Sequence, residues 1–225
     1  MYKKALFLVI ILIFTVSGII FSQNAQELRV GGFFSGYIGT GQEIWYSVRA
    51  VETGVLTVET MGDTDTFLTA YDSNRNFIAE NDDGDEDHNA RINLNAVEGR
   101  TYLFKLRGFG EDTIGSYRIF ASQKQIIELH PGTSYNGRII GIEEYWFRVR
   151  APRNGILVTE TSGEIDTMLV AYDNNFNLID SDDDSGTDYN AKLEIRVQTG
   201  AAYIILLKGF FSQNNGPYTL TASIR

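Results

Sequence analysis

The fold is decided by residues 65–83, DTFLTAYDSNRNFIAENDD, because almost the same stretch returns at residues 166–184 as DTMLVAYDNNFNLIDSDDD. Each stretch has an apolar run ending in Tyr-Asp, an Asn-rich turn, a second apolar pair and an acidic cluster. A shift of 101 residues extends the match without a gap, so that residues 27–124 align with residues 128–225. This period is too long for a solenoid repeat and has the size of a complete small domain. The sequence therefore predicts two tandem copies of one domain.

Within each copy, apolar residues alternate with polar ones. Tyr46 and Val48 alternate with Trp45 and Ser47, and the second copy repeats the pattern. A period of two is typical of half-buried strands, and turn residues recur about every eight to twelve positions. We therefore expect an all-β protein of two tandem antiparallel β-sandwich domains, jelly-roll-like in type. In the first copy the expected strands are residues 28–31, 34–38, 43–50, 54–60, 66–72, 76–80, 90–96, 101–107 and 116–122.

The composition limits the classes of partner. The 225 residues include no Cys, which excludes a disulfide framework, a thiolate metal site and a cysteine nucleophile. The 29 acidic residues exceed the 19 basic ones by ten. Such an acidic protein repels phosphate backbones and anionic lipid headgroups, so we expect no nucleic-acid partner. Divalent cations and basic protein surfaces suit this charge.

The N-terminus has the pattern of an export signal. Lys3 and Lys4 precede an apolar run from Ala5 to Phe21, and a polar stretch follows it. A basic segment followed by an apolar one predicts a signal peptide over residues 1–25. The alternative is a retained anchor, because the run approaches the length that spans a bilayer. We expect a secreted, periplasmic or cell-envelope protein, with no membrane insertion beyond this leader.

Further motifs carry a family resemblance. The strands WYSVRA and WFRVRA come before the Asp-Thr-x-Leu-x-x-Tyr-Asp stretch, and Gly-x-x-Tyr and Gly-x-Tyr motifs follow it at Tyr102, Tyr117, Tyr203 and Tyr218. This order resembles the bacterial pre-peptidase C-terminal (PPC) domain, a β-sandwich module, and is similar to the collagen-binding domains of clostridial collagenases. The resemblance covers nearly all of both copies. It implies a non-catalytic accessory module for secretion, substrate attachment or calcium-dependent stabilisation.

The acidic loops are the candidate metal sites. The candidate ligands are Asp82, Asp83, Asp85 and Asp87 in the first copy, and Asp182, Asp183, Asp184 and Asp188 in the second. Calcium takes six to eight oxygen ligands, and clustered carboxylates supply several. An EF-hand is excluded because His88 and Leu94 stand where its Gly and its bidentate Glu belong. The alternative is a solvated acidic turn whose Asp side chains bond backbone amides.

Two Asp residues bracket the apolar strand in each repeat, namely Asp65 and Asp72 in the first copy, and Asp166 and Asp173 in the second. They are either further ligands for the acidic loop or caps of the neighbouring turns. Since Asp commonly caps turns, we expect the second role.

Aromatic and basic residues on the WYSVRA and WFRVRA strands are the candidate ligand-binding residues: Trp45, Trp146, Arg49 and Arg150. An outward Trp beside Arg binds a peptide or sugar, or lies between the two domains. The alternative is a Trp lying over the edge of the sandwich with an Arg stacked on it.

Catalytic motifs are missing from the sequence. The two histidines, His88 and His130, do not occupy matching positions, and there is no nucleophile or phosphate-loop motif. We therefore predict no catalytic residues, although a carboxylate-based hydrolase stays an alternative.

The expected function is an exported, non-catalytic binding or accessory module that attaches to an extracellular or envelope protein or polysaccharide, with calcium assistance. The alternative is a structural or envelope-associated protein without a small-molecule ligand.

Overall fold

The structure, a computed structural model, describes residues 25–84 and 88–225. Within these ranges it is all-β, with eighteen strands in four sheets, which confirms the predicted fold class. No helix in the described ranges is long and apolar enough to cross a membrane. The predicted leader, apart from Ala25, lies outside the described residues, as do the candidate ligands Asp85 and Asp87.

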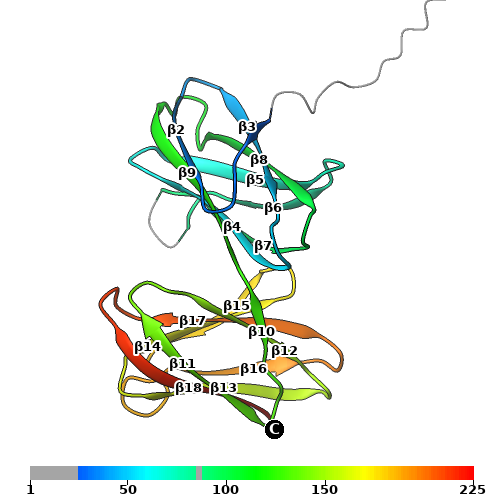
Figure 1. The fold of residues 1–225 in the computed structure, drawn as a ribbon, viewed down its shortest axis with the longest axis vertical. Helices are drawn as coiled ribbons and strands as arrows, with labels where there is room; N and C mark the ends of the chain where they lie inside the picture. Colours follow the sequence, from blue (N-terminus) through cyan, green and yellow to red (C-terminus); the bar gives the residue numbers. More distant parts are fainter. Residues whose placement is uncertain (1–24, 85–87) are drawn as a thin grey trace, which may run out of the picture.

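The first nine strands form domain 1, the upper part of Figure 1. One sheet has the order β1-β3-β8-β5-β6 and the other the order β2-β9-β4-β7. The strands are β1 (Gln26–Glu27), β2 (Phe33–Ile38), β3 (Glu43–Arg49), β4 (Gly54–Met61), β5 (Thr66–Asp72), β6 (Phe77–Asn81), β7 (Arg91–Ala96), β8 (Thr101–Gly108) and β9 (Gly115–Lys124).

The other nine strands form domain 2 and repeat this topology. The sheets have the orders β10-β12-β17-β14-β15 and β11-β18-β13-β16. The strands are β10 (Ile126–Glu128), β11 (Thr133–Ile140), β12 (Tyr145–Arg150), β13 (Gly155–Gly163), β14 (Thr167–Asp173), β15 (Leu178–Asp182), β16 (Lys192–Val197), β17 (Ala202–Gly209) and β18 (Asn215–Ile224).

The pairing is antiparallel except at one edge of each domain, where β1 pairs with β3 and β10 with β12 in parallel. The strand predicted at residues 28–31 is wrong, because the first strand ends at Glu27. Leu28 is buried in the core, its N–H donates to the carbonyl of Ser47, and the chain turns at Gly31 with a φ of 81°. The other expected strands of domain 1 lie within one or two residues of the observed ones.

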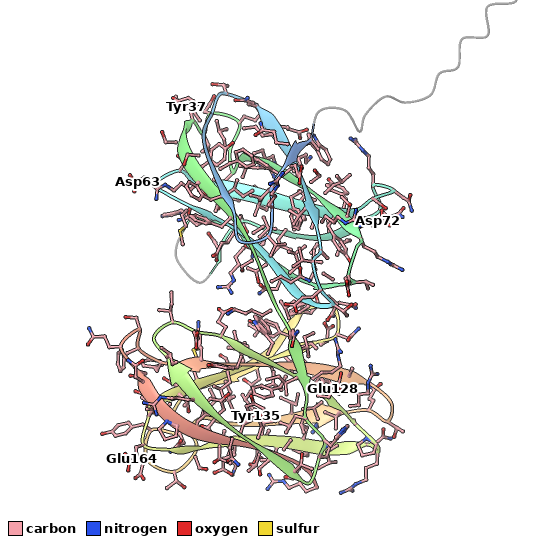
Figure 2. All side chains as sticks on the ribbon, viewed as in Figure 1. Tyr37, Asp63, Asp72, Glu128, Tyr135 and Glu164 are labelled. Carbon is pink, nitrogen blue, oxygen red and sulfur yellow. The ribbon has the colours of Figure 1, made fainter. Side chains whose placement is uncertain are left out.

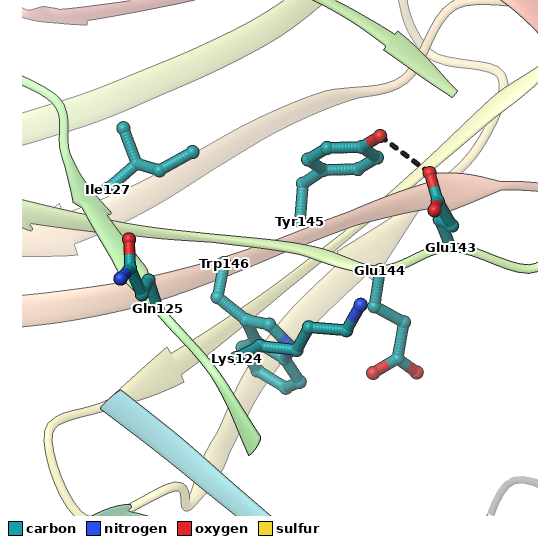
Figure 3. Close-up of a pocket in the computed structure, with 7 residues that line it drawn as sticks. All are labelled: Lys124, Gln125, Ile127, Glu143, Glu144, Tyr145 and Trp146. Atoms are coloured by element: carbon teal, nitrogen blue, oxygen red, sulfur yellow. Dashed lines mark hydrogen bonds between the residues drawn. The ribbon is translucent and has the colours of Figure 1, made fainter. Parts of the chain in front are cut away.

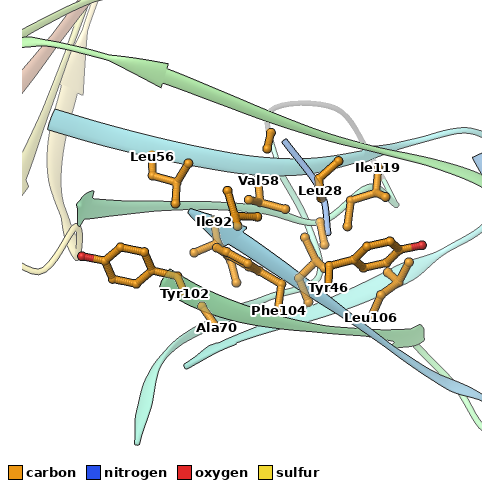
Figure 4. Packing of buried hydrophobic residues seen from close by; sticks show 14 of the residues in the cluster. Leu28, Tyr46, Leu56, Val58, Ala70, Ile92, Tyr102, Phe104, Leu106 and Ile119 are labelled. Carbon is orange, nitrogen blue, oxygen red and sulfur yellow. The ribbon is translucent and has the colours of Figure 1, made fainter. Parts of the chain in front are cut away.

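Each sandwich has its own apolar core between its two sheets. In domain 1, Tyr46 and Phe104 face Leu56 and Ile119 across the sandwich (Figure 4). This burial explains the alternation of the sequence, since these residues take the inward positions of their strands. The hydroxyls of Tyr46 and Tyr117 lie 2.6 Å apart in the core and satisfy each other.

A third apolar cluster joins the two domains. Val55 projects from the outer face of β4 and packs against Trp146, Val170, Ile204 and Leu206 on the outer face of the five-stranded sheet of domain 2. Val55 and Ile204 are completely buried. This contact with domain 2 explains why Val55 is buried although it lies on the outer face of its own sandwich. The two domains are therefore packed against each other at a specific surface.

Candidate functional site

The Asp-Thr motif builds the framework beside the acidic loop. The hydroxyls of Thr60 and Thr66 lie 2.6 Å apart, and the N–H of Ala90 donates to both, at 2.9 and 3.2 Å. Thr161, Thr167 and Ala191 repeat these bonds in domain 2. These Thr residues are buried, so the network fixes the end of the acidic loop against the core. The motif recurs because the fold recurs.

The Tyr-Asp motif caps a turn, as expected. Asp72 accepts hydrogen bonds from the N–H groups of Asn74 and Asn76 and from the side-chain amide of Asn76, at 2.7–2.9 Å. These bonds, those from Asn76 first, lower the pKa of Asp72. Asp173 makes the same three bonds in domain 2. Partial burial acts to raise the pKa of Asp173, but the bonds outweigh it and the net shift is downward.

The acidic loop of domain 2 divides into two parts. Asp182 accepts the backbone N–H groups of Ser185 and Lys192 at 3.0 and 2.7 Å, which is the role of an acidic turn residue. Asp183 and Asp184 lie near Asp166 instead. Partial burial first, and then the charges of Asp184 and Asp183, raise the pKa of Asp166. Its buried Oδ1 atom has no hydrogen-bond partner within the described residues.

Calcium binding by these loops stays a prediction. In the described residues, no three His, Cys, Asp or Glu side chains are grouped closely enough to hold a metal ion. Asp82 and Asp83 lie on the first loop, whose continuation at Asp85 and Asp87 is outside the described residues. Asp188 is exposed on the second loop.

The two tryptophans have different surroundings. Trp146 is 1 % exposed and lies between the domains, where Tyr172 and Phe176 pack on it at ring-centroid distances of 6.0 and 5.7 Å. Trp45 is half-buried, packs on Tyr71 at 5.4 Å, and carries the guanidinium of Arg75 4.6 Å from its ring centroid. Of the three arrangements that the sequence left open, Trp146 adopts the one between the domains and Trp45 the one with an arginine stacked on its ring.

Arg49 and Arg150 are exposed at the ends of β3 and β12. The arginine stacked on Trp45 is Arg75, which the sequence did not single out.

A shallow pocket of about 190 Å³ lies beside the interdomain linker (Figure 3). It is lined by Trp146 together with Lys124, Gln125 and Glu144. Ligand binding by Trp45, Trp146, Arg49 and Arg150 stays a prediction.

A larger groove lies on domain 1 and was missed from the sequence. It has a volume of about 850 Å³ and is formed by β2, the end of β4 and the start of β9. Met61 and Ile114 line it, together with Asp63 and Arg118. Figure 2 shows Tyr37 near the end of domain 1 that is farthest from domain 2, and Asp63 on the same side. We call this feature the domain 1 groove.

Exposed apolar side chains accompany the groove on the outward side of its strands. Phe33 is 61 % exposed and its ring lies 5.6 Å from that of Phe120 on the adjacent strand β9. Tyr37, Met61 and Ile114 are also about half exposed. The groove set is therefore Phe33, Tyr37, Met61, Ile114 and Phe120.

Domain 2 carries polar residues at all five corresponding positions. At the offset of 101 residues, the groove set corresponds to Ser134, Arg138, Ser162, Asn215 and Thr221, which are all exposed. The register is the same in both domains, since Gly36 pairs with Tyr117 and Gly137 with Tyr218. The framework therefore does not need apolar residues here, and a comparison of the two copies at outward positions is the signal that could have found the groove.

The groove also lies beside an open sheet edge. Among the described strands, β2 pairs with β9 alone, so its other edge presents unpaired backbone N–H and C=O groups. An open edge of this kind accepts an additional strand from another chain. Phe33 and Tyr37 alternate along β2 on the outward face, where an added strand would place its own side chains.

The geometry defines a tandem all-β protein whose two domains share one framework and differ in their outward surfaces. No protein-family model matches the chain, and no curated protein matches it. Among solved structures, the chain is similar to PliG of Aeromonas hydrophila, a periplasmic lysozyme inhibitor of g-type lysozyme. The TM-score is 0.35 and the identity 12 %, over 44 % of this chain and 97 % of that one.

A second similar structure is that of the CUB1-EGF-CUB2 domains of rat MASP-1. Here the TM-score is 0.28 and the identity 7 %, over 88 % of this chain and 99 % of that one. At such low TM-scores and identities, neither similarity assigns a family or a function to this chain.

Proposed function

We propose that the protein is an exported, non-catalytic binding module, and that the domain 1 groove binds an extended segment of an extracellular or envelope protein. The observation that carries the proposal is a set of five outward apolar side chains, four exposed and Phe120 half-buried, where domain 2 has five exposed polar ones. Exposed apolar clusters beside polar surroundings are typical of protein-interaction sites. The fold gives no other reason for these side chains, because domain 2 folds in the same way without them.

A protein partner fits the groove better than a polysaccharide. The edge of β2 offers main-chain hydrogen bonds to an extended peptide, and the groove beside it offers apolar surface to the peptide's side chains. Met61 and Ile114 are aliphatic or flexible, which suits apolar peptide side chains. The PPC resemblance and the basic-apolar N-terminal segment support attachment outside the cytoplasm.

Calcium assistance belongs to the proposal as a separate part. The carboxylates concerned in the described chain include Asp183 and Asp184, whose charges add to partial burial in raising the pKa of Asp166 and would be offset by a cation. As these side chains stand, no three of them are grouped closely enough to hold the ion, so binding would draw the loop in around it. The proposed role is to hold the loop rather than to contact the partner, since the groove lies on domain 1.

The test uses backbone amide NMR of the full chain with defined probes. The probes are heptapeptides of alternating Val and Thr, gelatin, soluble peptidoglycan fragments and chito-oligosaccharides. We expect a peptide to shift the amide signals of β2 and the start of β9. A glycan that shifts these signals while every peptide leaves them unchanged would contradict a protein partner.

A copy-swapped variant is the matched control. It carries Phe33→Ser, Tyr37→Arg, Met61→Ser, Ile114→Asn and Phe120→Thr, each the residue of domain 2 at the same position. Because domain 2 folds with these residues, we expect an unchanged fold and a loss of the peptide-induced shifts. Shifts that persist in a folded copy-swapped variant would contradict the assignment of the groove.

A further inference from the structure

The joint between the two domains uses one face of each, and leaves the matching faces open. Domain 1 contributes the outer face of β4 and β7, and domain 2 contributes the outer face of its five-stranded sheet around Trp146. The corresponding faces are the β13 and β16 surface of domain 2 and the Trp45 surface of domain 1. Nothing in the described part of the chain covers either of these two faces with a second domain. In Figure 1, β13 and β16 lie on the side of domain 2 away from domain 1.

We infer that copies of this chain associate head to tail, with the β13 and β16 face of one copy on the Trp45 face of the next. The contact would repeat the internal joint. The partner is thus a second copy of this chain, and the surface is distinct from the domain 1 groove. The contacting residues of the internal joint have counterparts on the two open faces at the offset of 101 residues.

The contact of an aliphatic side chain with an indole at the centre of the joint is kept on both open faces. Internally, Val55 packs on Trp146. The corresponding residues are Ile156 and Trp45, so the branched aliphatic side chain and the indole are both present. Ile156 is partly exposed, in contrast to the fully buried Val55. Ile156 is expected to be exposed in this way as long as no second copy packs on it.

The main ion pair is also kept. Internally, the guanidinium of Arg91 donates to both oxygens of Glu144 at 2.7 Å. The corresponding residues are Lys192 and Glu43, which have the same charges on the same sides. Glu43 here pairs with Lys105, and Lys192 with Glu194, at 2.9 and 3.5 Å. Both are partly exposed pairs, which exchange partners at little cost.

In a second polar pair, both residues differ between the internal joint and the open faces. Internally, neutral Asn95 accepts a hydrogen bond from the cation Arg148 at 3.2 Å, and Arg148 also pairs with Glu128. On the open faces the cation is on the other partner, since Asn95 corresponds to Arg196 and Arg148 to Ser47. Glu27, the counterpart of Glu128, would then form an ion pair with Arg196 of the next copy. Because one face gains the cation that the other loses, the pair stays complementary.

The other differences are a neutral one, Thr69 in place of Val170, and several that change the charge of the faces. The Trp45 face has Lys105 and Arg75 where the Trp146 face has Leu206 and Phe176. The approaching face has Glu194 where the internal one has Asn93. Lys105 and Arg75 attract Glu194 of the approaching face, which also carries Lys192 and Arg196, and they disfavour a face-to-face contact of two Trp45 surfaces. The open faces are also more polar than the internal joint. This suits surfaces that are exposed to solvent whenever the copies are apart.

A head-to-tail contact does not close on itself unless the rotation does, so it produces open chains of increasing length. The internal joint is strengthened by its short linker, which supplies an effective concentration in the millimolar range. Without a linker, the same contact between copies forms at high protein concentration. Lower ionic strength strengthens it because charge pairs contribute.

Sedimentation equilibrium of the mature chain over a wide concentration range tests the inference. We expect the weight-average mass to rise without a plateau at the dimer, and to fall with added salt. Ile156→Asp removes the approaching face, Trp45→Asp removes the receiving face, and each variant alone should stay monomeric. An equimolar mixture of the two should form dimers and nothing larger, since each variant keeps one working face. Phe211→Asp, an exposed change in the loop between β17 and β18 and on neither face, should assemble as the wild type does.

Three outcomes would overturn the inference: a monomer at all concentrations, a closed dimer, or a mixture of the two variants that stays monomeric. Monomeric wild type would leave the groove proposal intact, because the peptide titration uses residues on another surface. The pair Lys192→Glu with Glu43→Lys adds a second check. Each change alone should weaken assembly at least about tenfold, and the two together in one chain should restore it, whereas no restoration would contradict the proposed pairing.

Discussion

Arg91 of domain 1 and Glu144 of domain 2 form an ion pair across the interdomain joint, in which the Nη2 atom of Arg91 lies 2.7 Å from both carboxylate oxygens of Glu144. Both side chains are largely buried, with exposed fractions of 16 and 18 %. Arg91 also lies 3.7 Å from Glu59 of its own domain. The pair ties the two domains together at one point of the joint, because charge-assisted hydrogen bonds of this length are among the stronger ones.

Loss of this pair should uncouple the domains. Glu144→Ala removes the nearest carboxylate from the largely buried guanidinium of Arg91 and leaves Glu59, at 3.7 Å, in place. We therefore expect a loss of about 2 kcal/mol in the free energy of unfolding. Denaturant titration of the full chain measures it. Glu43→Ala is the control, since Glu43 holds the matching position in domain 1 and is 48 % exposed. A loss below about 1 kcal/mol is expected there, and equal losses in the two variants would contradict the role of Glu144.

The two tryptophans should differ in their contribution to stability. Trp146→Ala opens the centre of the joint and should cost about 3 kcal/mol, whereas Trp45→Ala should cost roughly 1 kcal/mol because its ring is partly exposed. Small-angle scattering should show a larger radius of gyration for Trp146→Ala alone. An unchanged radius in that variant would mean that the joint does not depend on Trp146.

The buried hydroxyl pair of the Asp-Thr motif should be a stability determinant. Thr66→Val removes one acceptor of the Ala90 N–H and the partner of Thr60 while keeping the shape of the side chain. We expect a loss of about 1–2 kcal/mol, measured by chemical denaturation. Thr167→Val should cost the same in domain 2, since its bonds are equivalent. A neutral effect in both would show that the remaining hydroxyl satisfies Ala90 or Ala191 on its own.

The raised pKa of Asp166 predicts a dependence of stability on pH. A carboxyl group whose folded pKa lies above its unfolded pKa of about 3.9 disfavours the folded state when it is ionised. Asp166→Asn should therefore raise the melting temperature at pH 7, in the absence of calcium. The gain should shrink as the pH falls through the folded pKa and disappear below the unfolded one. Asp188→Asn, an exposed change in the same loop, is the control, and a gain that is independent of pH would contradict the account.

Calcium should reverse the sign of that substitution. If the ion is bound near Asp166, Asp183 and Asp184, the wild type gains about 2.7 kcal/mol at a concentration of 100 times the dissociation constant. A thermal melt with calcium against chelator measures this gain, and Asp166→Asn should remove most of it. An unchanged midpoint in the wild type would contradict calcium binding.

Much of the framework could be predicted from the sequence because burial imposes period two on each strand. Tyr46 and Val48 face the core and their neighbours do not, so the strands and the tandem repeat follow directly. The first strand was misplaced because Leu28 is apolar for a different reason: it enters the core after the strand has ended.

The outward positions could not be assigned in the same way. Val55 and Ile156 are both aliphatic residues on outer faces, yet one is buried in the joint and the other is partly exposed. Which face is covered depends on how the linker places domain 1, and no local pattern records that. The groove was missed for a related reason, since Phe33 and Tyr37 follow the strand alternation whether or not their outward neighbours bind anything.

The central claim is that the groove set makes a binding site on a framework that does not itself bind. Grafting the set onto domain 2, by Ser134→Phe, Arg138→Tyr, Ser162→Met, Asn215→Ile and Thr221→Phe, tests it most directly. Calorimetric titration with the heptapeptide that binds the wild type measures the stoichiometry. We expect one peptide per wild-type chain, two per grafted chain and none per copy-swapped chain. A folded grafted chain that still binds one peptide would contradict it.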